Sequence, residues 1–283
     1  MHVLDIEVSP GLLNSWVDWL APDRQPFFVT AKQAKAWSLS PEPAEPDKQL
    51  RDTYRTYNLD SRLKSVWLDE AGFMELPRQT RGALVRAQVT HDRDAVPTVR
   101  AWREVLGQDI AQQADGHRFV WWKSVLRDVA PVVLPRIVSE DFGPSRHRAV
   151  PTSVWSASDG ALPRARELAG TFPDGSGPNC FGTVMAAAGV DGAAEEWMLR
   201  EPFDAWLDQH TTRGGRDEVP GTVLVWRDNN RAVQHAAVTL GAGWALHKPS
   251  QSWMSPRKIR TTQEILRSTR TPGWHLTRHT ITT

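Results

Sequence analysis

The sequence predicts an α+β protein built from two parts, residues 1–150 and residues 151–283. A chain of 283 residues exceeds the usual size of one domain, and its pattern changes near Trp155. In the second part, helical segments come first and strand-forming segments follow. That order favours an antiparallel sheet packed against helices over the strict alternation of a doubly wound sheet.

The first part mixes strand and helix patterns, which predicts a mixed α/β region. Residues 2–8 alternate as a strand does, and residues 118–122 (Arg-Phe-Val-Trp-Trp) are rich in strand formers. Apolar residues recur at helical spacing in residues 11–20, 76–89 and 96–114. The proline-rich stretches 40–49 and 129–151 are expected to be loop and linker. No motif here points to a chemistry, so substrate recognition, partner docking and a cover for a cleft all stay open.

The second part is predicted to supply the sheet. Helices are expected at residues 161–170, 180–189, 201–210 and 261–270, and strands at residues 221–226, 232–240, 243–248 and 274–282. Thr261 and Glu264 have the spacing of a capping box at the start of the last helix. The short basic run at residues 255–260 is expected to be a solvated face.

Composition excludes several classes of protein. The 34 basic and 33 acidic residues leave a formal charge of +1, which gives no electrostatic case for nucleic acid or an anionic membrane. No apolar run approaches 18 residues, so no membrane span is expected. A single cysteine rules out an intrachain disulfide and suits a reducing compartment, and the first residues do not resemble a secretory signal. We therefore expect a cytoplasmic protein, without a cofactor and with its oligomeric state open.

The single cysteine, Cys180, stands at the predicted start of a helix. The positive end of the helix dipole and the free N–H groups there favour the thiolate, which is the nucleophilic form. The backbone N–H of Cys180 is a candidate oxyanion donor, because the first N–H groups of a helix lack intrahelical partners. The preceding loop of glycine, serine and proline lets a substrate approach closely, and we assign Ser176 and Asn179 to substrate binding.

Two histidines provide a candidate base and its orienting group. His235 opens an apolar strand, a glycine-rich turn follows at residues 241–243, and His247 ends the return strand. With a three-residue turn, His235 pairs near Pro249 and His247 near Ala237, so the two imidazoles are diagonal neighbours on one face. One imidazole can then act as a base while the other orients it. Trp244, at the start of the return strand, is assigned to substrate binding.

These residues resemble the second half of the NlpC-type papain-like cysteine peptidases. The matching parts are Pro220-Gly221 with the strand to Trp226, then His235 followed by Ala-Ala-Val-Thr-Leu-Gly-Ala-Gly, then His247-Lys248-Pro249. Gly-Pro-Asn-Cys-Phe-Gly stands where the family has Asp-Cys-Ser-Gly, and the family's tyrosine before the cysteine is absent. The resemblance covers about Trp155 to Thr283. It implies a papain-like domain in which Cys180 is the nucleophile, His235 the general base and His247 its orienting residue.

The implied reaction is acyl transfer from an amide or ester of a small peptide or peptide-like substrate through a thioester. The primary prediction is a hydrolase (amidase or peptidase), in which water is the acceptor. An acyltransferase or peptide-bond-forming enzyme uses the same three residues with an amine as acceptor. A catalytically silent binding module on the same fold is the alternative outside enzymes. A Cys-His-His metal site is chemically possible but is not preferred, because helix-start cysteine and hairpin histidines already fit acyl transfer.

Overall fold

The computed structural model describes residues 1–42, 47–93, 95–108 and 110–282, and the chain divides into two compact units. Unit 1 comprises Met1 and Ser9–Ile137, and unit 2 comprises His2–Val8 and Val138–Thr283. The division thus falls earlier in the chain than the expected 150/151, and the first few residues join the second unit. Part of the predicted loop at residues 40–49 lies outside the described residues.

Unit 1 is built around one antiparallel pair of strands, β3 (Arg24–Thr30) and β4 (Leu63–Asp69). Helix α5 (Arg78–Thr90) packs against β3, and buried Gln88 on that helix accepts from the N–H of Phe28 and donates to its carbonyl. The core is aromatic, with Phe73 stacked on Phe27 at 5.4 Å and Trp122 beside both. The other helices of this unit lie at α1 (Pro10–Leu20), α2 (Ala31–Ala36), α3 (Lys48–Thr53), η1 (Thr56–Asn58), α4 (Glu70–Glu75), α6 (Val99–Leu106), α7 (Ile110–Gln113), α8 (Lys123–Leu126) and η2 (Arg127–Val129).

Several expectations for the first half are corrected. Residues 2–8 form not one strand but a small hairpin of β1 (His2–Val3) and β2 (Ile6–Glu7), turned by Leu4 and Asp5 at positive φ. Residues 118–122 are not a strand, because among the described residues they have no partner strand and only Arg118 forms isolated bridges, with Thr98 and with Asp115. The predicted linker contains α9 (Ala130–Asp141), which tolerates Pro135 inside it. The division between the units falls within α9.

Unit 2 contains a six-stranded antiparallel sheet in the order β5-β10-β6-β7-β8-β9. Its strands are β5 (Thr211–Arg213), β6 (Thr222–Arg227), β7 (Val233–Gly241), β8 (Trp244–His247), β9 (Lys258–Thr261) and β10 (His275–Ile281). The helices are η3 (His147–Ala149), α10 (Thr152–Ser158), α11 (Ala165–Leu168), α12 (Cys180–Ala187), α13 (Arg200–His210) and α14 (Thr262–Ser268). The prediction of an α+β fold with an antiparallel sheet in the second half is confirmed.

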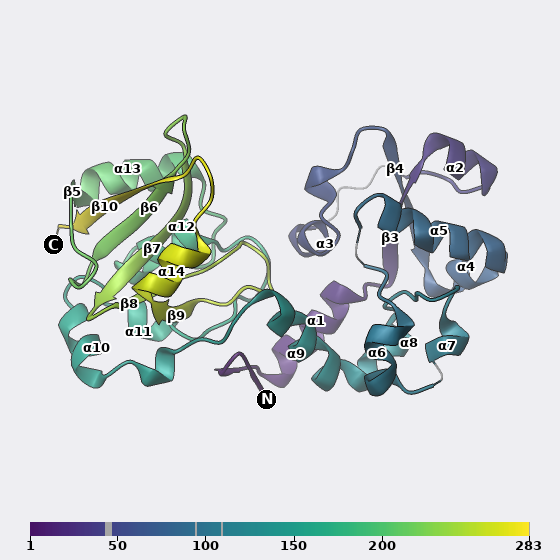
Figure 1. Ribbon diagram of the computed structural model, residues 1–283, viewed down its shortest axis with the longest axis horizontal. Coiled ribbons are helices and arrows are strands. Elements are labelled where there is room, and N and C mark those ends of the chain that lie inside the picture. Colours follow the sequence, from purple (N-terminus) through teal and green to yellow (C-terminus); the bar gives the residue numbers. More distant parts are fainter. Residues whose placement is uncertain (43–46, 94, 109, 283) are drawn as a thin grey trace. The chain divides into compact units, whose positions relative to one another are not determined.

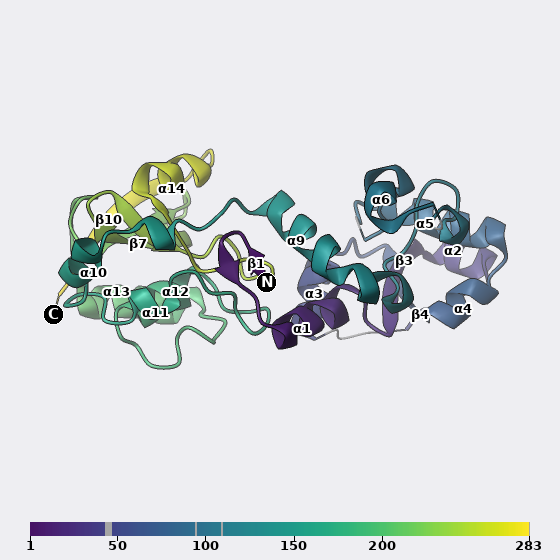
Figure 2. The same ribbon diagram turned by 90° about the horizontal axis from the view of Figure 1, so that it is seen from below.

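Each face of the sheet is covered by helices, as Figures 1 and 2 show, with α14 on one side and α11, α12 and α13 on the other. The larger core lies on the α12 side, where Ala236 and Val238 of β7 pack with the helix. The smaller core lies under α14, where Ala237 packs with Trp226 and Ile265. The capping box predicted at Thr261 and Glu264 is present at the start of α14. Alternate residues of β7 therefore serve two different cores.

The basic run at residues 255–260 is not a solvated face. Its second half forms the strand β9, which the sequence patterns did not predict. Arg257 and Lys258 are both 4% exposed. Arg257 donates to the carbonyl of Ala194 and lies near Glu195, and Lys258 donates to the carbonyl of Gly143 at 3.2 Å. Each buried cation is thus matched by acceptors, which is what its burial requires.

Candidate active site

Helix α12 begins at Cys180 because Asn179 caps it. The Oδ1 atom of Asn179 accepts from the N–H of Gly182 at 3.1 Å, and its Nδ2 atom donates to the carbonyl of Met198 at 2.7 Å. Capping satisfies an N–H group that has no partner within the helix. Both ends of this side chain are therefore engaged in holding the start of the helix. The expectation that Asn179 binds substrate receives no support from these contacts, which give it a structural role.

The loop before the cysteine is held by the loop that follows β8. Ser176 is 5% exposed, and its hydroxyl oxygen accepts from the N–H of Trp253 at 3.2 Å. The N–H of the next residue, Gly177, donates to the carbonyl of Gln251 at 2.9 Å. These two hydrogen bonds join the segment that leads into α12 to residues 250–255. Ser176, assigned to substrate binding from the sequence, here positions a loop.

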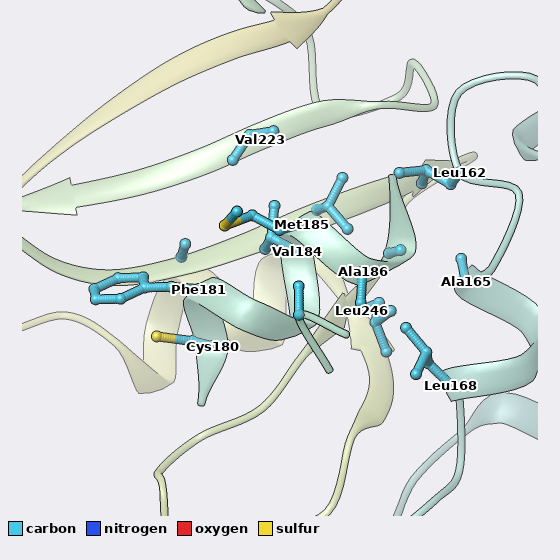
Figure 3. Close-up of a cluster of buried hydrophobic side chains, with 14 of the residues drawn as sticks. Leu162, Ala165, Leu168, Cys180, Phe181, Val184, Met185, Ala186, Val223 and Leu246 are labelled. Carbon is cyan, nitrogen blue, oxygen red and sulfur yellow. The ribbon is translucent and has the colours of Figure 1, made fainter. Parts of the chain in front are cut away.

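The Cys180 side chain lies at the first position of α12 and at the edge of the larger core (Figure 3). It is 8% exposed. Burial raises the pKa of the Cys180 thiol to about 11, although the backbone N–H groups of Ala236, Phe181 and Cys180 itself and the charge of Lys248 act in the opposite direction. In this arrangement the cysteine is an uncharged thiol at neutral pH. Its sulfur lies against the peptide N–H of Ala236, the residue that follows His235.

The hairpin of β7 and β8 has the register that the sequence predicts. Val238 pairs with Leu246 and Thr239 with Ala245, and the same register continued along the strands sets Ala237 opposite His247. His235 and His247 are then diagonal neighbours, and their ring centroids are 6.0 Å apart with the rings perpendicular. The turn carries Ala242 and its two flanking glycines at positive φ. The predicted pairing of the two imidazoles on one face of the hairpin is therefore confirmed.

Both histidines are buried and uncharged. His235 is 6% exposed and His247 is 4% exposed. Burial lowers the pKa of His235 to about 4. It also lowers the pKa of His247 well below its ordinary value, and the neighbouring His235, Lys258 and Arg260 act in the same direction. Among the described residues, none supplies a hydrogen-bond partner to the buried Nε2 atom of His235 or to either buried ring nitrogen of His247, and unpaired buried polar atoms cost stability.

These buried imidazoles predict a loss of stability in acid. Because the pKa of His235 is near 6.5 in the unfolded chain and about 4 in the folded one, the unfolded state binds more protons between these values. The free energy of unfolding should therefore fall as the pH drops from 7 to 4, by about 3 kcal/mol from His235 alone. His247 adds to this loss. Urea unfolding at several pH values should show a smaller loss in His235→Gln, and an equal loss in both proteins would contradict the burial of a neutral imidazole.

No hydrogen bond joins Cys180 to either imidazole in the described part of the chain. By strand alternation, His235 falls on the same side as Ala237, whereas Ala236 faces α12. His235 pairs with Trp226, and their rings are 5.4 Å apart. A bulge directly precedes His235, where the register shifts, and bulges re-aim neighbouring side chains. The thiol thus lies on the α12 side of the sheet and the imidazole on the opposite side, so the structure does not bring them together, and pairing them requires a rearrangement at the start of β7.

The remaining sequence expectation for the site concerns Trp244. It is the first residue of β8, whereas His247 is the last, and a strand rises about 3.3 Å per residue. Its Cα therefore lies about 10 Å from that of His247. Trp244 is partly buried and packs against the larger core. The structure does not bring it to the histidines, so its role in substrate binding has no support here.

Cys180, His235 and His247 do not form a set of metal ligands. Among the described residues, no group of three or more histidine, cysteine, aspartate or glutamate side chains is placed to hold a metal ion. No described helix combines the length and the apolar character needed to cross a bilayer.

The sequence analysis did not predict two buried charged residues near the site, Lys248 and Lys258. A lysine among polar residues is normally expected to be exposed to solvent.

Comparison with protein-family models, curated proteins and solved structures finds no significant match. The chemistry of the site is therefore argued from its own residues.

Proposed function

We propose that unit 2 is a papain-like cysteine enzyme that transfers the acyl group of a small peptide or peptide-like amide through a thioester on Cys180. The observation that carries the proposal is the placement of the only cysteine at a helix start, against the peptide N–H that follows His235. The imidazole of His247 lies next to that of His235, and their ring centroids are 6.0 Å apart. A nucleophile, a base and an orienting group in that sequence are what acyl transfer uses.

The reaction proceeds in two balanced steps. His235 takes the thiol proton as the sulfur attacks the carbonyl carbon, and the backbone N–H of Cys180 donates to the oxyanion. The tetrahedral intermediate collapses, the C–N bond breaks, and His235 returns the proton to the leaving amine. His235 then deprotonates water, which attacks the thioester and releases a carboxylic acid and the free thiol. An amine that enters in place of water yields a new amide by the same route.

Both imidazoles of the resting site are able to accept a proton, but the pKa values of His235 (about 4) and Cys180 (about 11) oppose transfer from thiol to imidazole until substrate binding brings them closer. Since the pKa of His235 is lowered to about 4, its imidazole is neutral at pH 7 and can accept a proton. His247 is neutral for the same reason, so one of its nitrogens can accept from protonated His235. The unpartnered buried ring nitrogens leave these positions available. Because His235 faces away from α12, the mechanism requires the start of β7 to rearrange when substrate binds, so that the imidazole reaches the thiol.

A second candidate function is a binding module that keeps this fold without catalysis. The observation that favours it is the resting thiol itself, which is buried, has a raised pKa and makes no hydrogen bond to either imidazole. In such a module Cys180 is a packing residue of the core. Its replacement by alanine would then leave ligand affinity unchanged.

Intact-mass spectrometry on the full chain separates the two functions. The protein is incubated with a panel of dipeptide amides and N-acyl amino-acid thioesters, with and without a primary amine, and is quenched in acid. We expect an acyl adduct on Cys180 that forms and turns over in the wild type, whereas His235→Ala should form none from the amides and should deacylate slowly after reaction with a thioester, because both steps use the base. Free acid as product indicates hydrolysis, and a new amide indicates transfer. Turnover that is equal in wild type and Cys180→Ala would reject the proposal.

A further inference from the structure

Lys248 follows His247 directly and is completely buried. Its Nζ atom donates to the carbonyl of Ser250 at 2.6 Å and to that of Ser252 at 3.0 Å. A buried ammonium group needs such acceptors in place of water. Because two carbonyls of one short segment bind the same cation, the cation restricts the conformation of that segment. Lys248 thus sets the conformation of residues 250–255, which we name the serine loop.

Hydrogen bonds within the serine loop close it around the lysine. The N–H of Ser250 donates to the hydroxyl of Ser255 at 3.1 Å, and the N–H of Ser252 donates to the hydroxyl of Ser250 at 3.0 Å. Ser255 and Trp253 are completely buried. The loop is therefore an ordered part of unit 2: its carbonyls bind the buried cation, and its serine hydroxyls accept from its own N–H groups.

The serine loop is also hydrogen-bonded to Ser176 and Gly177, in the segment that precedes Cys180. Gln251 accepts from the N–H of Gly177, and Trp253 donates to the hydroxyl of Ser176. Three residues later the chain enters α12 at Cys180. Hydrogen bonds thus tie the ammonium of Lys248 to the serine loop, and the serine loop to Ser176 and Gly177, from which the chain leads directly into α12.

We propose that Lys248 is the positioning residue of the nucleophile: its buried ammonium fixes the serine loop, which in turn fixes Ser176 and Gly177 just before α12. The inference rests on the proposed cysteine chemistry and adds to it a residue outside the expected triad. The charge of Lys248 also acts to lower the pKa of the Cys180 thiol, although burial outweighs it.

Two variants separate the charge of Lys248 from its hydrogen bonds. Lys248→Gln keeps an N–H donor and removes the charge, and Ser176→Ala keeps the charge and removes one hydrogen bond between the loops. Arg257→Met is the matched control, because it removes another buried cation of the same region whose acceptors, Ala194 and Thr171, lie away from the serine loop. Thermal melting of each variant shows which of them is folded.

Two readouts test the proposal on the full chain. In iodoacetamide alkylation of Cys180 across pH, we expect Lys248→Gln to move the midpoint to higher pH, while Ser176→Ala and Arg257→Met leave it in place. In hydrogen exchange, we expect faster exchange at residues 176–181 in Lys248→Gln and Ser176→Ala, but not in Arg257→Met.

The outcomes separate this inference from the proposed function. An alkylation midpoint and exchange rates in Lys248→Gln equal to those of the wild type would overturn the role of Lys248. If Lys248→Gln does not fold, unchanged exchange at residues 176–181 in Ser176→Ala overturns the loop connection by itself. The proposed function fails on a different result, namely a wild-type alkylation profile that does not depend on His235.

Discussion

Replacing Cys180 with alanine is expected to lower the rate of acyl transfer by roughly 10⁴- to 10⁶-fold, the scale on which removal of a nucleophile acts in triad hydrolases. Without the sulfur no thioester forms, and the residual rate comes from substrate binding and the oxyanion donor alone. The fold should survive, because the thiol makes no hydrogen bond to either imidazole and alanine occupies part of the same volume. The measurement is turnover of the panel compound that the wild type processes fastest.

The control for this prediction is stability. Cys180→Ala should melt within a few degrees of the wild type, because a small side chain is removed at the edge of the core. A variant that retains more than a tenth of the wild-type turnover would contradict the assignment of Cys180 as nucleophile. In that case the cysteine is a packing residue, and the binding module becomes the better account.

Gly182→Ala is expected to displace α12 and to destabilise unit 2 by about 3 kcal/mol or more. A Cβ atom at this position would lie 2.1 Å from the carbonyl oxygen of Ala193, which belongs to backbone and not to a flexible side chain. Ala193 is 2% exposed, so the segment has little room to retreat. This close approach explains the glycine two residues after the cysteine. Differential scanning calorimetry should show a melting temperature lower by on the order of 10 °C.

Gly160→Ala is the matched control for that measurement. A Cβ atom there meets no other atom within 4 Å, and no positive φ strains it. Its melting temperature should stay within a few degrees of the wild type. If Gly182→Ala melts together with Gly160→Ala, the packing of α12 against residues 193–196 is looser than this structure has it.

The sequence predicted the second half better than the first, for physical reasons. In β6, β7 and α12 the local pattern and the tertiary environment agree, so the hairpin register followed from the glycine turn alone. Strand β3 was missed because it contains Pro26 and is buried along most of its length, which removes the alternation that marks a strand. Helix α9 was missed because Pro135 was taken as a sign of a linker, although Val133, Leu134 and Val138 have helical spacing. In the structure these three residues are completely buried.

The candidate site was predicted only in part. The sequence placed Cys180 at a helix start and set His235 diagonal to His247, since both follow from local chemistry. It could not show that the side chains of Asn179 and Ser176 form hydrogen bonds that hold the helix start and the loops, because their partners are distant in the chain. Lys248 was missed for the same reason: its burial depends on a loop that folds over it.

The most direct test of the central claim is the pH profile of Cys180 alkylation by iodoacetamide, followed by mass spectrometry in the wild type and in His235→Ala. If His235 activates the nucleophile, the wild type should react well below pH 8.5, the midpoint of an ordinary thiol, and the variant should react only at higher pH. Cys180 that titrates near pH 11 in both proteins, the value that its resting surroundings give without help from His235, would contradict activation by that histidine.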